Sequence, residues 1–562
     1  WWLFFHLKDE MTDAERIEAG EPIAGLEYVG VVDQPKQSLV HRYRFPLQDY
    51  DIKVGTNVVD PATWGKGQGN PGEVVALDQA ARTIDLKRSR KSVAPHPTSL
   101  VPFDDYTTPE QEKALLRLGR WVAASGLEND GPHRAALDLL QARPARVGQA
   151  EGDVLRRPGE ADLEAARRLA IALDRSTLAI QGPPGSGKTF GGARMALDLV
   201  RAGKRVGVTA TSHKVISNFL AKLLEAAKEE RTPVSIIQKA GGEPTGIEHP
   251  SYQLAGENDD VRDALASRAA SVGAGTTWLW AREEMAGSVD VLFVDEAGQM
   301  SLANVLSAAG CAESLVLLGD PQQLDQPLQG SHPPGADRSA LAHMVGDEAA
   351  TIDDRFGLFL ETTWRLHPDV CDYTSEVFYD GRLEPRPGLE NQALHGPIPT
   401  DGTGLRLLTV EHAGNDHDSV EEADVVARLA RALVEGSATW TDDEGDVEPI
   451  GWDKVVIVAA YNAQVGLIKE RLPEEARVGT VDKFQGQEAP ISIYSMASSS
   501  AEDAPRGMAF LYSRHRLNVA TSRARCVTTI VASPELFKAR ARTPDQMRLA
   551  NAFARFAELA KG

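Results

Sequence analysis

The sequence predicts an α/β protein that contains two tandem parallel-sheet domains and a small β-barrel. First, strand-like apolar runs alternate with helical stretches from residue 156 onward, a pattern typical of parallel sheets with right-handed crossovers. Second, this alternation runs through two successive segments, 156–352 and 353–562. Third, short β-branched runs separated by Gly and Pro fill residues 23–102, which favours a small barrel.

The part of the chain before residue 156 is predicted to carry the barrel between helical segments. Helical patterns occupy residues 1–22 and 103–155. The barrel strands are expected at residues 28–32, 57–59, 72–77 and 83–86. The barrel ends on a basic run, Lys87-Arg88-Ser89-Arg90-Lys91, which is either a solvated loop or a contact with a nucleic-acid backbone.

Each of the two later domains has its own set of predicted strands. The strands of the first are expected at residues 178–181, 206–209, 291–294 and 314–318. The strands of the second are expected at residues 358–361, 405–410, 454–459, 478–480, 491–495 and 527–531. Charged, turn-rich residues 224–270 are interpreted as an insertion in the first domain, and acidic residues 411–448 as a solvated helix and loop.

A complete phosphate-binding loop lies between a strand-like run and a helix-like run. It consists of Gly182, Pro183, Pro184, Gly185, Ser186, Gly187, Lys188 and Thr189. The glycines let backbone N–H groups converge on an anion, and the helix N-terminus adds its positive dipole end. Lys188 is expected to meet the β- and γ-phosphates and Thr189 to bind Mg²⁺. A chance glycine-rich turn would not combine all these features, so we predict a nucleoside triphosphate site.

A carboxylate pair follows the apolar strand at residues 291–294. Asp295 at the carboxyl end of such a buried strand can hold the Mg²⁺ shell, and Glu296 can orient and deprotonate the attacking water. Most Asp-Glu pairs lie on solvated surface, but this one has a phosphate loop upstream. The pair therefore predicts that the chain hydrolyses the bound nucleotide.

The composition is that of an ordinary soluble protein and argues against several classes. The 562 residues carry a net charge of −21, which disfavours a generally basic surface but leaves room for a local basic channel. Cys311, Cys371 and Cys526 lie far apart, so neither a zinc site nor an iron–sulfur cluster is predicted. No apolar stretch reaches the length of a membrane span, and we expect a cytoplasmic protein without a membrane partner.

The first residues are Trp1-Trp2-Leu3-Phe4-Phe5, with no initiator Met. A signal peptide would have a basic start and a longer apolar run. We therefore expect the beginning to be an internal cut in a longer protein.

Eight motifs in the right order resemble those of superfamily 1 helicases, in the branch of the nonsense-mediated-decay helicase and the flap-processing nuclease-helicase. They lie at residues 182–189, 209–214, 275–277, 295–299, 319–324, 363–368, 481–488 and 517–525. The resemblance covers about residues 155–540. It implies two RecA-like domains with ATP between them, and an accessory barrel on a helical stalk that covers the nucleic-acid strand.

The resemblance also implies roles for residues of the nucleotide site. Arg365 and Arg523, both expected from the second domain, correspond to arginine fingers, so that hydrolysis requires domain closure. Gln323 corresponds to a γ-phosphate sensor, and Glu488 is placed in the same site. Trp364 matches an aromatic that stacks on the base, with a buried core Trp as the alternative.

Nucleic acid is expected to cross the carboxyl ends of both parallel sheets. The polar or aromatic residues predicted to contact it are Thr211, Ser212, Thr276, Tyr461, Asn462, Thr480 and Gln485. Such groups hydrogen-bond phosphates and read no sequence, so we expect sequence-tolerant binding to single strands.

One departure from the family concerns the base of the nucleotide. The family has a Gln that reads the adenine edge about seventeen residues before the phosphate loop. Residues 163–168 contain none, so adenine selectivity is in doubt.

The leading hypothesis is an ATP- and Mg²⁺-dependent, monomeric translocase and helicase on single-stranded DNA. The 5′→3′ polarity comes from the family alone. The opening of the chain is similar to bacterial fusions of a RecB-like nuclease to such a helicase, which favours DNA and places a nuclease before Trp1. The alternatives are an RNA or ribonucleoprotein remodeller, a nucleotide-gated single-strand clamp, and a degenerate structural module.

Overall fold

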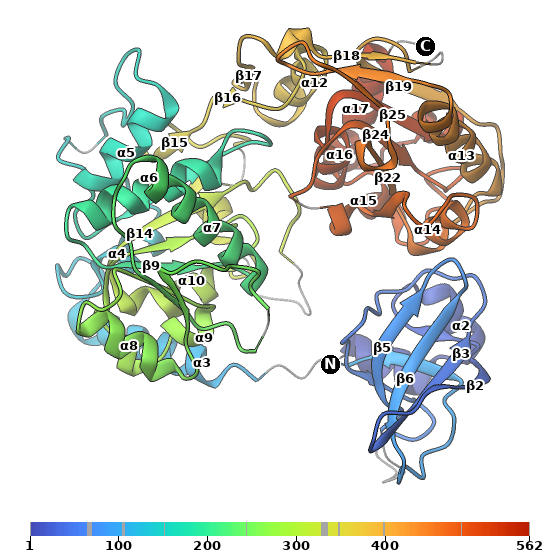
Figure 1. The fold of residues 1–562 in the computed structure, drawn as a ribbon, viewed down its shortest axis with the longest axis horizontal. Helices are drawn as coiled ribbons and strands as arrows, with labels where there is room; N and C mark the ends of the chain where they lie inside the picture. The colour runs from blue at the N-terminus through green and yellow to red at the C-terminus, as the bar shows by residue number, and fades with distance from the viewer. Residues whose placement is uncertain are drawn as a thin grey trace. The chain divides into compact units, whose positions relative to one another are not determined.

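The computed structural model describes residues 2–64, 70–103, 107–150, 152–242, 244–326, 335–346, 349–396, 400–484 and 486–560. The chain forms two compact units (Figure 1). The P-loop unit consists of Thr107–Arg365 and Phe378–Arg386. The barrel unit consists of Trp1–Tyr106, Leu366–Val377 and Pro387–Gly562.

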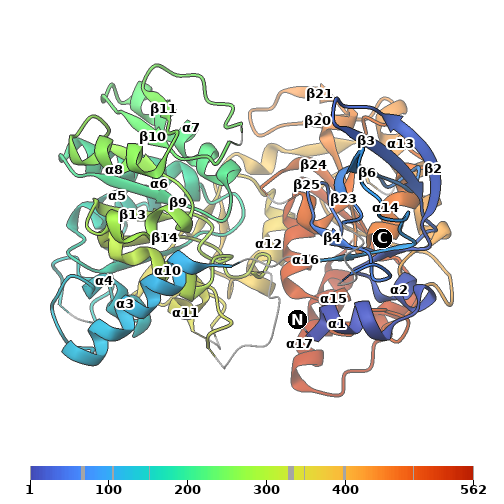
Figure 2. The ribbon, with the colours of Figure 1, turned by 90° about the horizontal axis from the view of Figure 1, so that it is seen from below.

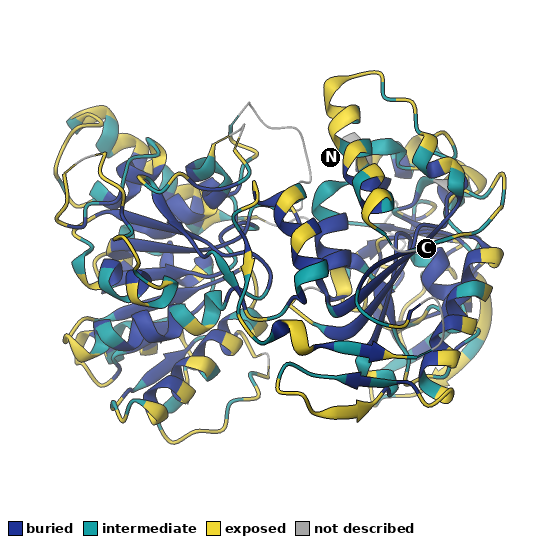
Figure 3. Cartoon of the chain, turned by 90° about the horizontal axis from the view of Figure 1, so that it is seen from above, coloured by how far each residue is buried: buried dark blue, intermediate teal, exposed yellow. Residues whose placement is uncertain are grey.

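A parallel eight-stranded sheet is the centre of the P-loop unit. Its strand order is β11-β10-β12-β9-β13-β14-β8-β15. The strands are β8 (Thr177–Gln181), β9 (Val206–Thr209), β10 (Ile236–Gln238), β11 (Tyr252–Leu254), β12 (Val272–Ala274), β13 (Val289–Val294), β14 (Ala312–Gly319) and β15 (Gly357–Phe359). The central strands are largely buried on both faces, which explains the apolar runs at residues 178–180, 291–294 and 315–318 within them (Figure 3). The prediction of a parallel α/β domain is confirmed.

Helices cover the two faces of this sheet. They are α3 (Pro109–Ser125), α4 (Arg134–Leu140), α5 (Asp162–Ala172), α6 (Lys188–Arg201), α7 (His213–Glu229), α8 (Asn258–Ala266), α9 (Thr277–Trp280), α10 (Leu302–Ala308) and α11 (Ala340–Val345). Helices α5, α6 and α7 share one core with the sheet residues Val208, Phe293 and Val316. Helix α3 packs along α10 (Figure 2).

Two details of the predicted first domain are wrong. Residues 224–270 do not interrupt the sheet, because β10 and β11 extend it in parallel pairing beyond β12. The strand predicted at residues 358–361 for the second domain is instead β15, which pairs with β8 at the other edge of the first sheet. The P-loop unit accordingly continues past residue 352 to Arg365.

The barrel unit contains a second parallel sheet of five strands, in the order β19-β25-β24-β22-β23. The strands are β19 (Gly404–Thr409), β22 (Val455–Ala459), β23 (Arg477–Thr480), β24 (Ala489–Ser495) and β25 (Ala524–Ala532). A separate antiparallel sheet contains β18 (Ala393–His395), β20 (Thr439–Thr441) and β21 (Val447–Pro449), and its residues Leu394 and Trp440 share a buried core with the five-stranded sheet. The helices in this C-terminal part of the unit are α12 (Pro368–Phe378), α13 (Val420–Glu435), α14 (Asn462–Lys469), α15 (Gly507–Leu511), α16 (Arg514–Ser522) and α17 (Pro544–Leu559). A tandem pair of parallel-sheet folds is therefore present, as predicted.

The N-terminal part of the barrel unit consists of two small antiparallel sheets. One contains β2 (Glu27–Asp33), β3 (Ser38–Arg44), β6 (Thr83–Ser89) and β5 (Glu73–Asp78), and the other β1 (Ile23–Ala24), β7 (Ser99–Pro102) and β4 (Val58–Val59). Residues of both sheets, including Ile23, Tyr43, Ile84 and Leu100, share one buried core. Strand β3 was not predicted from the sequence, because most of its residues are polar; it lies in the middle of the larger sheet.

The predicted helix of residues 1–22 consists of separate pieces. They are α1 (Trp2–Phe5), a π-helix (His6–Glu10) and α2 (Asp13–Ala19). Thr12 and Glu15 form a reciprocal capping box that begins α2. Among the described residues, no helix is long and apolar enough to cross a membrane.

Candidate functional site

The phosphate loop joins β8 to α6 in the P-loop unit. Gly185 and Gly187 have φ angles of +73° and +77°, in the left-handed region that a side chain disfavours. A Cβ atom on Gly185 would lie 2.5 Å from the Arg365 Cβ, so the loop also needs glycine for close packing. Lys188 begins α6, and its Nζ donates to the carbonyl of Gly182. The loop thus presents a helix N-terminus and a lysine at the carboxyl end of a buried strand.

The predicted carboxylate pair follows β13, two strands away from the loop. Asp295 is 3% exposed, and burial together with the neighbouring Glu296 raises the pKa of its carboxyl. The nearby charge of Lys188 acts on that pKa in the opposite direction. Glu296 has φ +54°, a strained backbone for a non-glycine residue that costs on the order of 1 kcal/mol. Strain of this kind often marks a functional position.

The end of β14 contacts both preceding motifs. The carbonyl of Gly319 accepts a hydrogen bond from Gly182 N at 2.9 Å, and that of Leu318 accepts from Ala297 N at 2.8 Å. The phosphate loop, the carboxylate pair and the Gln323 motif therefore lie together at the carboxyl ends of the parallel strands.

Gln323 is anchored by a buried carboxylate. Asp320 Oδ2 accepts from Gln323 Nε2 at 2.9 Å and from the Tyr379 hydroxyl at 2.6 Å. Asp320 and Tyr379 are both buried. Sequence reasoning missed Tyr379, because nothing local connects it to a motif 59 residues upstream.

The segment 363–365 packs directly on the phosphate loop. Thr363 Oγ1 donates to Pro184 O at 3.0 Å, and Trp364 N donates to Gly185 O at 2.9 Å. The Trp364 side chain is 64% exposed, so the alternative of a buried core Trp is wrong. Arg365 belongs to the P-loop unit, which corrects the expectation that both arginines come from the opposite domain.

Arg523 and Glu488 lie in the barrel unit. Arg523 is buried at the end of α16, and its Nη1 donates to Gln487 O at 3.2 Å. Glu488 forms an ion pair with Arg525. Of the two predicted arginine fingers, Arg523 is the one that the other unit carries.

A cavity of about 440 Å³ opens beside the phosphate loop within the P-loop unit. Ser186, Gly187 and Lys188 form its loop side. Its other walls are mostly apolar and include Leu163 from α5, the helix that contains residues 163–168, where the family's adenine-reading Gln is missing. The volume lies in the range of small-molecule sites and suits a nucleoside next to the triphosphate loop.

The residues of the P-loop unit that are predicted to contact nucleic acid lie at the ends of neighbouring β-strands. Thr211 and Ser212 follow β9 and are exposed, and Ser212 caps α7 by accepting from Val215 N at 3.3 Å. Thr276 follows β12 and precedes α9. Because β9 and β12 are adjacent and parallel, these side chains share one edge of the sheet.

In the barrel unit, the contacts of two predicted residues differ from expectation. Tyr461 is 1% exposed and packs its ring against Phe510. The prediction that this side chain contacts nucleic acid is therefore wrong. Asn462 donates to Tyr50 O and accepts from Gln79 Nε2, both at 2.6 Å, and both partners come from the barrel. Thr480 ends β23 and is half-buried. Gln485 lies outside the described residues.

The loop, the Asp295-Glu296 pair with its buried aspartate, and the parallel sheets define a P-loop nucleotide-binding protein with two sheet domains. Two family models, each described as an AAA domain, match residues 161–333 and 337–535. The regulator of nonsense transcripts 1 homolog of Drosophila melanogaster is 25% identical and matches 67% of this chain. DNA-binding protein SMUBP-2 of Mus musculus is 23% identical and matches 75% of this chain. The DNA polymerase alpha-associated DNA helicase A of Schizosaccharomyces pombe is 24% identical and matches 64% of this chain.

The chain belongs to the superfamily 1 helicases, in the branch that contains the nonsense-mediated-decay helicase. The matches cover 35%, 47% and 61% of the lengths of these three relatives. Among solved structures, the Arterivirus nonstructural protein 10 helicase is 14% identical with a TM-score of 0.39, over 98% of this chain and 82% of that one.

Proposed function

We propose that this chain is an ATP-driven translocase and helicase that moves 5′→3′ on single-stranded DNA as a monomer. The observation that carries the proposal is that the carboxyl ends of one parallel sheet hold the phosphate loop, the Asp295-Glu296 pair with its strained Glu296 backbone, and the strand-end residues Ser212 and Thr276. Nucleotide chemistry and strand contact then act on the same rigid sheet. Movement of the sheet during hydrolysis would therefore move the residues that contact the nucleic-acid strand.

The nucleotide would be held and hydrolysed by residues of both units. Lys188 would bind the β- and γ-phosphates, Gln323 would contact the γ-phosphate, and Glu296 would orient and deprotonate the attacking water. Arg365 and Arg523 would stabilise the charge that spreads over the leaving phosphoryl group. Glu488 would complete the site from the barrel unit.

Asp295 and Thr189 fit the needs of a Mg²⁺ ion. They supply a carboxylate and a hydroxyl oxygen, which are ligand types that Mg²⁺ prefers. Burial raises the pKa of Asp295, so a cation beside it would favour the ionised carboxylate. Mg²⁺, when bound, neutralises charge on the phosphates.

Two observations favour DNA over RNA as the substrate. Two relatives carry DNA in their names, SMUBP-2 and the DNA polymerase alpha-associated helicase. The similarity of the opening residues to nuclease–helicase fusions supports the same choice, and it supports a nuclease as the partner in DNA processing. The second candidate is an RNA remodeller, which the regulator of nonsense transcripts 1 homolog favours.

Strand displacement on tailed duplexes tests this function. We expect ATP-dependent displacement from a duplex with a 5′ single-stranded DNA tail and none from a 3′ tail. Ribose in place of deoxyribose in the tail should reduce displacement, since the 2′-OH separates the two substrates. Preference for the ribose tail would establish the RNA candidate, and ATP-dependent binding without displacement would establish a clamp.

A further inference from the structure

An exposed phenylalanine beside the phosphate loop has no role in phosphate binding. Phe190 follows Thr189 in the first turn of α6, and 47% of its surface is exposed. It lines the 440 Å³ cavity together with Leu163 and Trp364. Since large aromatics are normally buried, an aromatic face left open at the edge of a ligand cavity suggests a ligand that covers it.

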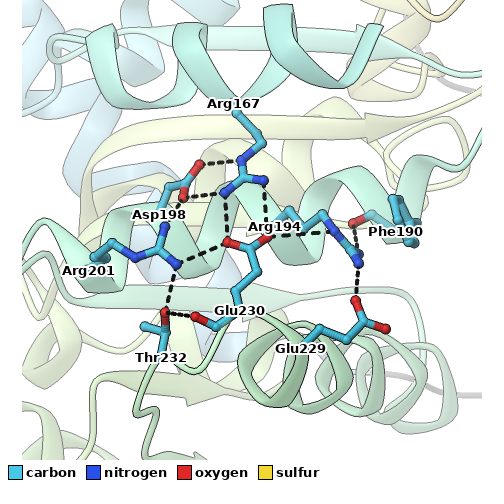
Figure 4. Close-up of polar contacts among 8 residues, drawn as sticks. All are labelled: Arg167, Phe190, Arg194, Asp198, Arg201, Glu229, Glu230 and Thr232. Carbon is cyan, nitrogen blue, oxygen red and sulfur yellow. Dashed lines mark hydrogen bonds and ion pairs between the residues drawn. The ribbon is translucent and has the colours of Figure 1, made fainter.

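The ring of Phe190 is held from one side by a buried arginine. The guanidinium carbon of Arg194 lies 3.4 Å from the ring centroid, and its Nη1 reaches the Phe190 carbonyl at 3.4 Å (Figure 4). Arg194 is only 9% exposed. A cation stacked on the ring at this distance restrains the ring and leaves its other face for a ligand.

Arg194 is itself held by carboxylates at the end of α7. Its Nη2 pairs with Glu229, and its Nε lies 3.8 Å from Glu230 Oε1. Glu230 also accepts two hydrogen bonds from Arg167 of α5, at 2.9 and 3.0 Å (Figure 4). The position of Phe190 is therefore set by a network that joins α5, α6 and α7.

The Asp162 carboxylate, which lines the cavity, is already engaged. Asp162 Oδ2 accepts from Thr362 N at 3.0 Å, and its Oδ1 pairs with Arg156 at 2.6 Å. The stretch of α5 next to it offers Leu163 and Ala166 to the cavity. A base in this cavity therefore meets ring faces and mostly apolar walls.

We propose that Phe190 is a stacking surface for the nucleobase and that Arg194 is the residue that positions it. This rests on the nucleotide site proposed above. Stacking recognises the face that every base has and not its edge, so ATP and GTP should bind with similar affinity. The aromatic pair Phe190 and Trp364 thus replaces the adenine-reading Gln that the sequence lacks.

The test compares nucleotides with a ligand that has no base. The Kd values of Mg·ATP, Mg·GTP and Mg·tripolyphosphate are measured for the whole chain by titration calorimetry. Stacking of one base corresponds to a change in Kd on the order of 5- to 100-fold. Phe190→Ala should raise the Kd of Mg·ATP and the Kd of Mg·GTP by a similar factor, about tenfold. It should leave the Kd of Mg·tripolyphosphate unchanged. Arg194→Met should raise the nucleotide Kd values severalfold.

Arg201→Met is the matched control. Arg201 belongs to the same network, with a 3.0 Å bond to Glu230, but does not contact Phe190. Its nucleotide Kd should stay that of the unaltered chain, whereas a purely structural network would make the two arginine variants equal. Phe190→Trp, which keeps an aromatic face, should restore nucleotide affinity.

Two failures can be told apart. An unchanged nucleotide Kd in Phe190→Ala, an equal loss of tripolyphosphate binding, or a preference for ATP over GTP above tenfold would overturn this inference. Undiminished binding of nucleotides and tripolyphosphate by Lys188→Ala would instead overturn the nucleotide site itself. In steady-state hydrolysis, Phe190→Ala should raise KM and leave kcat nearly unchanged.

Discussion

Removal of one buried hydroxyl, in Tyr379→Phe, should destabilise the P-loop unit and slow hydrolysis. The hydroxyl donates to the carboxylate of Asp320 at 2.6 Å in a buried site, and the same oxygen holds Gln323. A hydrogen bond to a charged group contributes roughly 1.5–3 kcal/mol. We expect a loss of about 2 kcal/mol in the free energy of unfolding of this unit, or roughly 4–8 °C in its melting temperature.

A second tyrosine of the chain is the matched control for this variant. The hydroxyl of Tyr512 is also buried and donates at 2.6 Å, but to the neutral carbonyl of Leu536 in the barrel unit. Tyr512→Phe should lose only about 1 kcal/mol, in the transition of the barrel unit, and should keep normal hydrolysis. Calorimetric unfolding and steady-state hydrolysis are measured side by side. Equal destabilisation by the two variants with unaltered hydrolysis in both would refute the reasoning.

Three further predictions test separate parts of the nucleotide and nucleic-acid sites. Arg523→Ala should bind ATP nearly normally but hydrolyse it 10³–10⁵-fold more slowly; a main effect on affinity would exclude the arginine-finger role. Asp295 has a raised pKa, so without Mg²⁺ its burial lowers stability as pH rises above the ordinary pKa of 3.8. Asp295→Asn should remove this pH dependence, raise the melting temperature at neutral pH without Mg²⁺ and abolish hydrolysis; an unchanged pH profile would contradict the burial argument. Gln79→Ala removes a barrel contact of Asn462 and should free this side chain for nucleic acid, so that single strands bind a few-fold more tightly in filter binding. Asn462→Ala should weaken the binding of single strands. Weaker binding in both variants would argue against competition between the barrel and the nucleic acid for Asn462.

The sequence predicted the strands that are buried on both faces and missed those whose partners are distant. Residues 291–294 of β13 and 455–459 of β22 are apolar and buried, as expected for strands that are covered on both faces, so their pattern alone reveals them. β10 and β11 have three residues each in a charged stretch, and only their pairing makes them part of the sheet. β15 follows the first domain closely in sequence but pairs with β8, more than 170 residues earlier, and no local pattern encodes that pairing.

The candidate site follows the same rule. Short motifs predicted the loop, the carboxylate pair and Gln323, because each motif is one strand end with its turn. Tyr379 lies far in sequence from Asp320, and Gln79 lies 383 residues from its partner Asn462. The cation–π contact of Arg194 with Phe190 is local, one helical turn apart, and could have been noticed from the i, i+4 spacing on a predicted helix.

Steady-state ATP hydrolysis with and without short single strands tests the central claim most directly. The assay compares no strand, single-stranded DNA and RNA of the same sequence, with Lys188→Ala to correct for background turnover. The account predicts strong stimulation by DNA, weaker stimulation by RNA and no turnover in the variant. Hydrolysis that neither strand stimulates, or turnover that persists in Lys188→Ala, would contradict it.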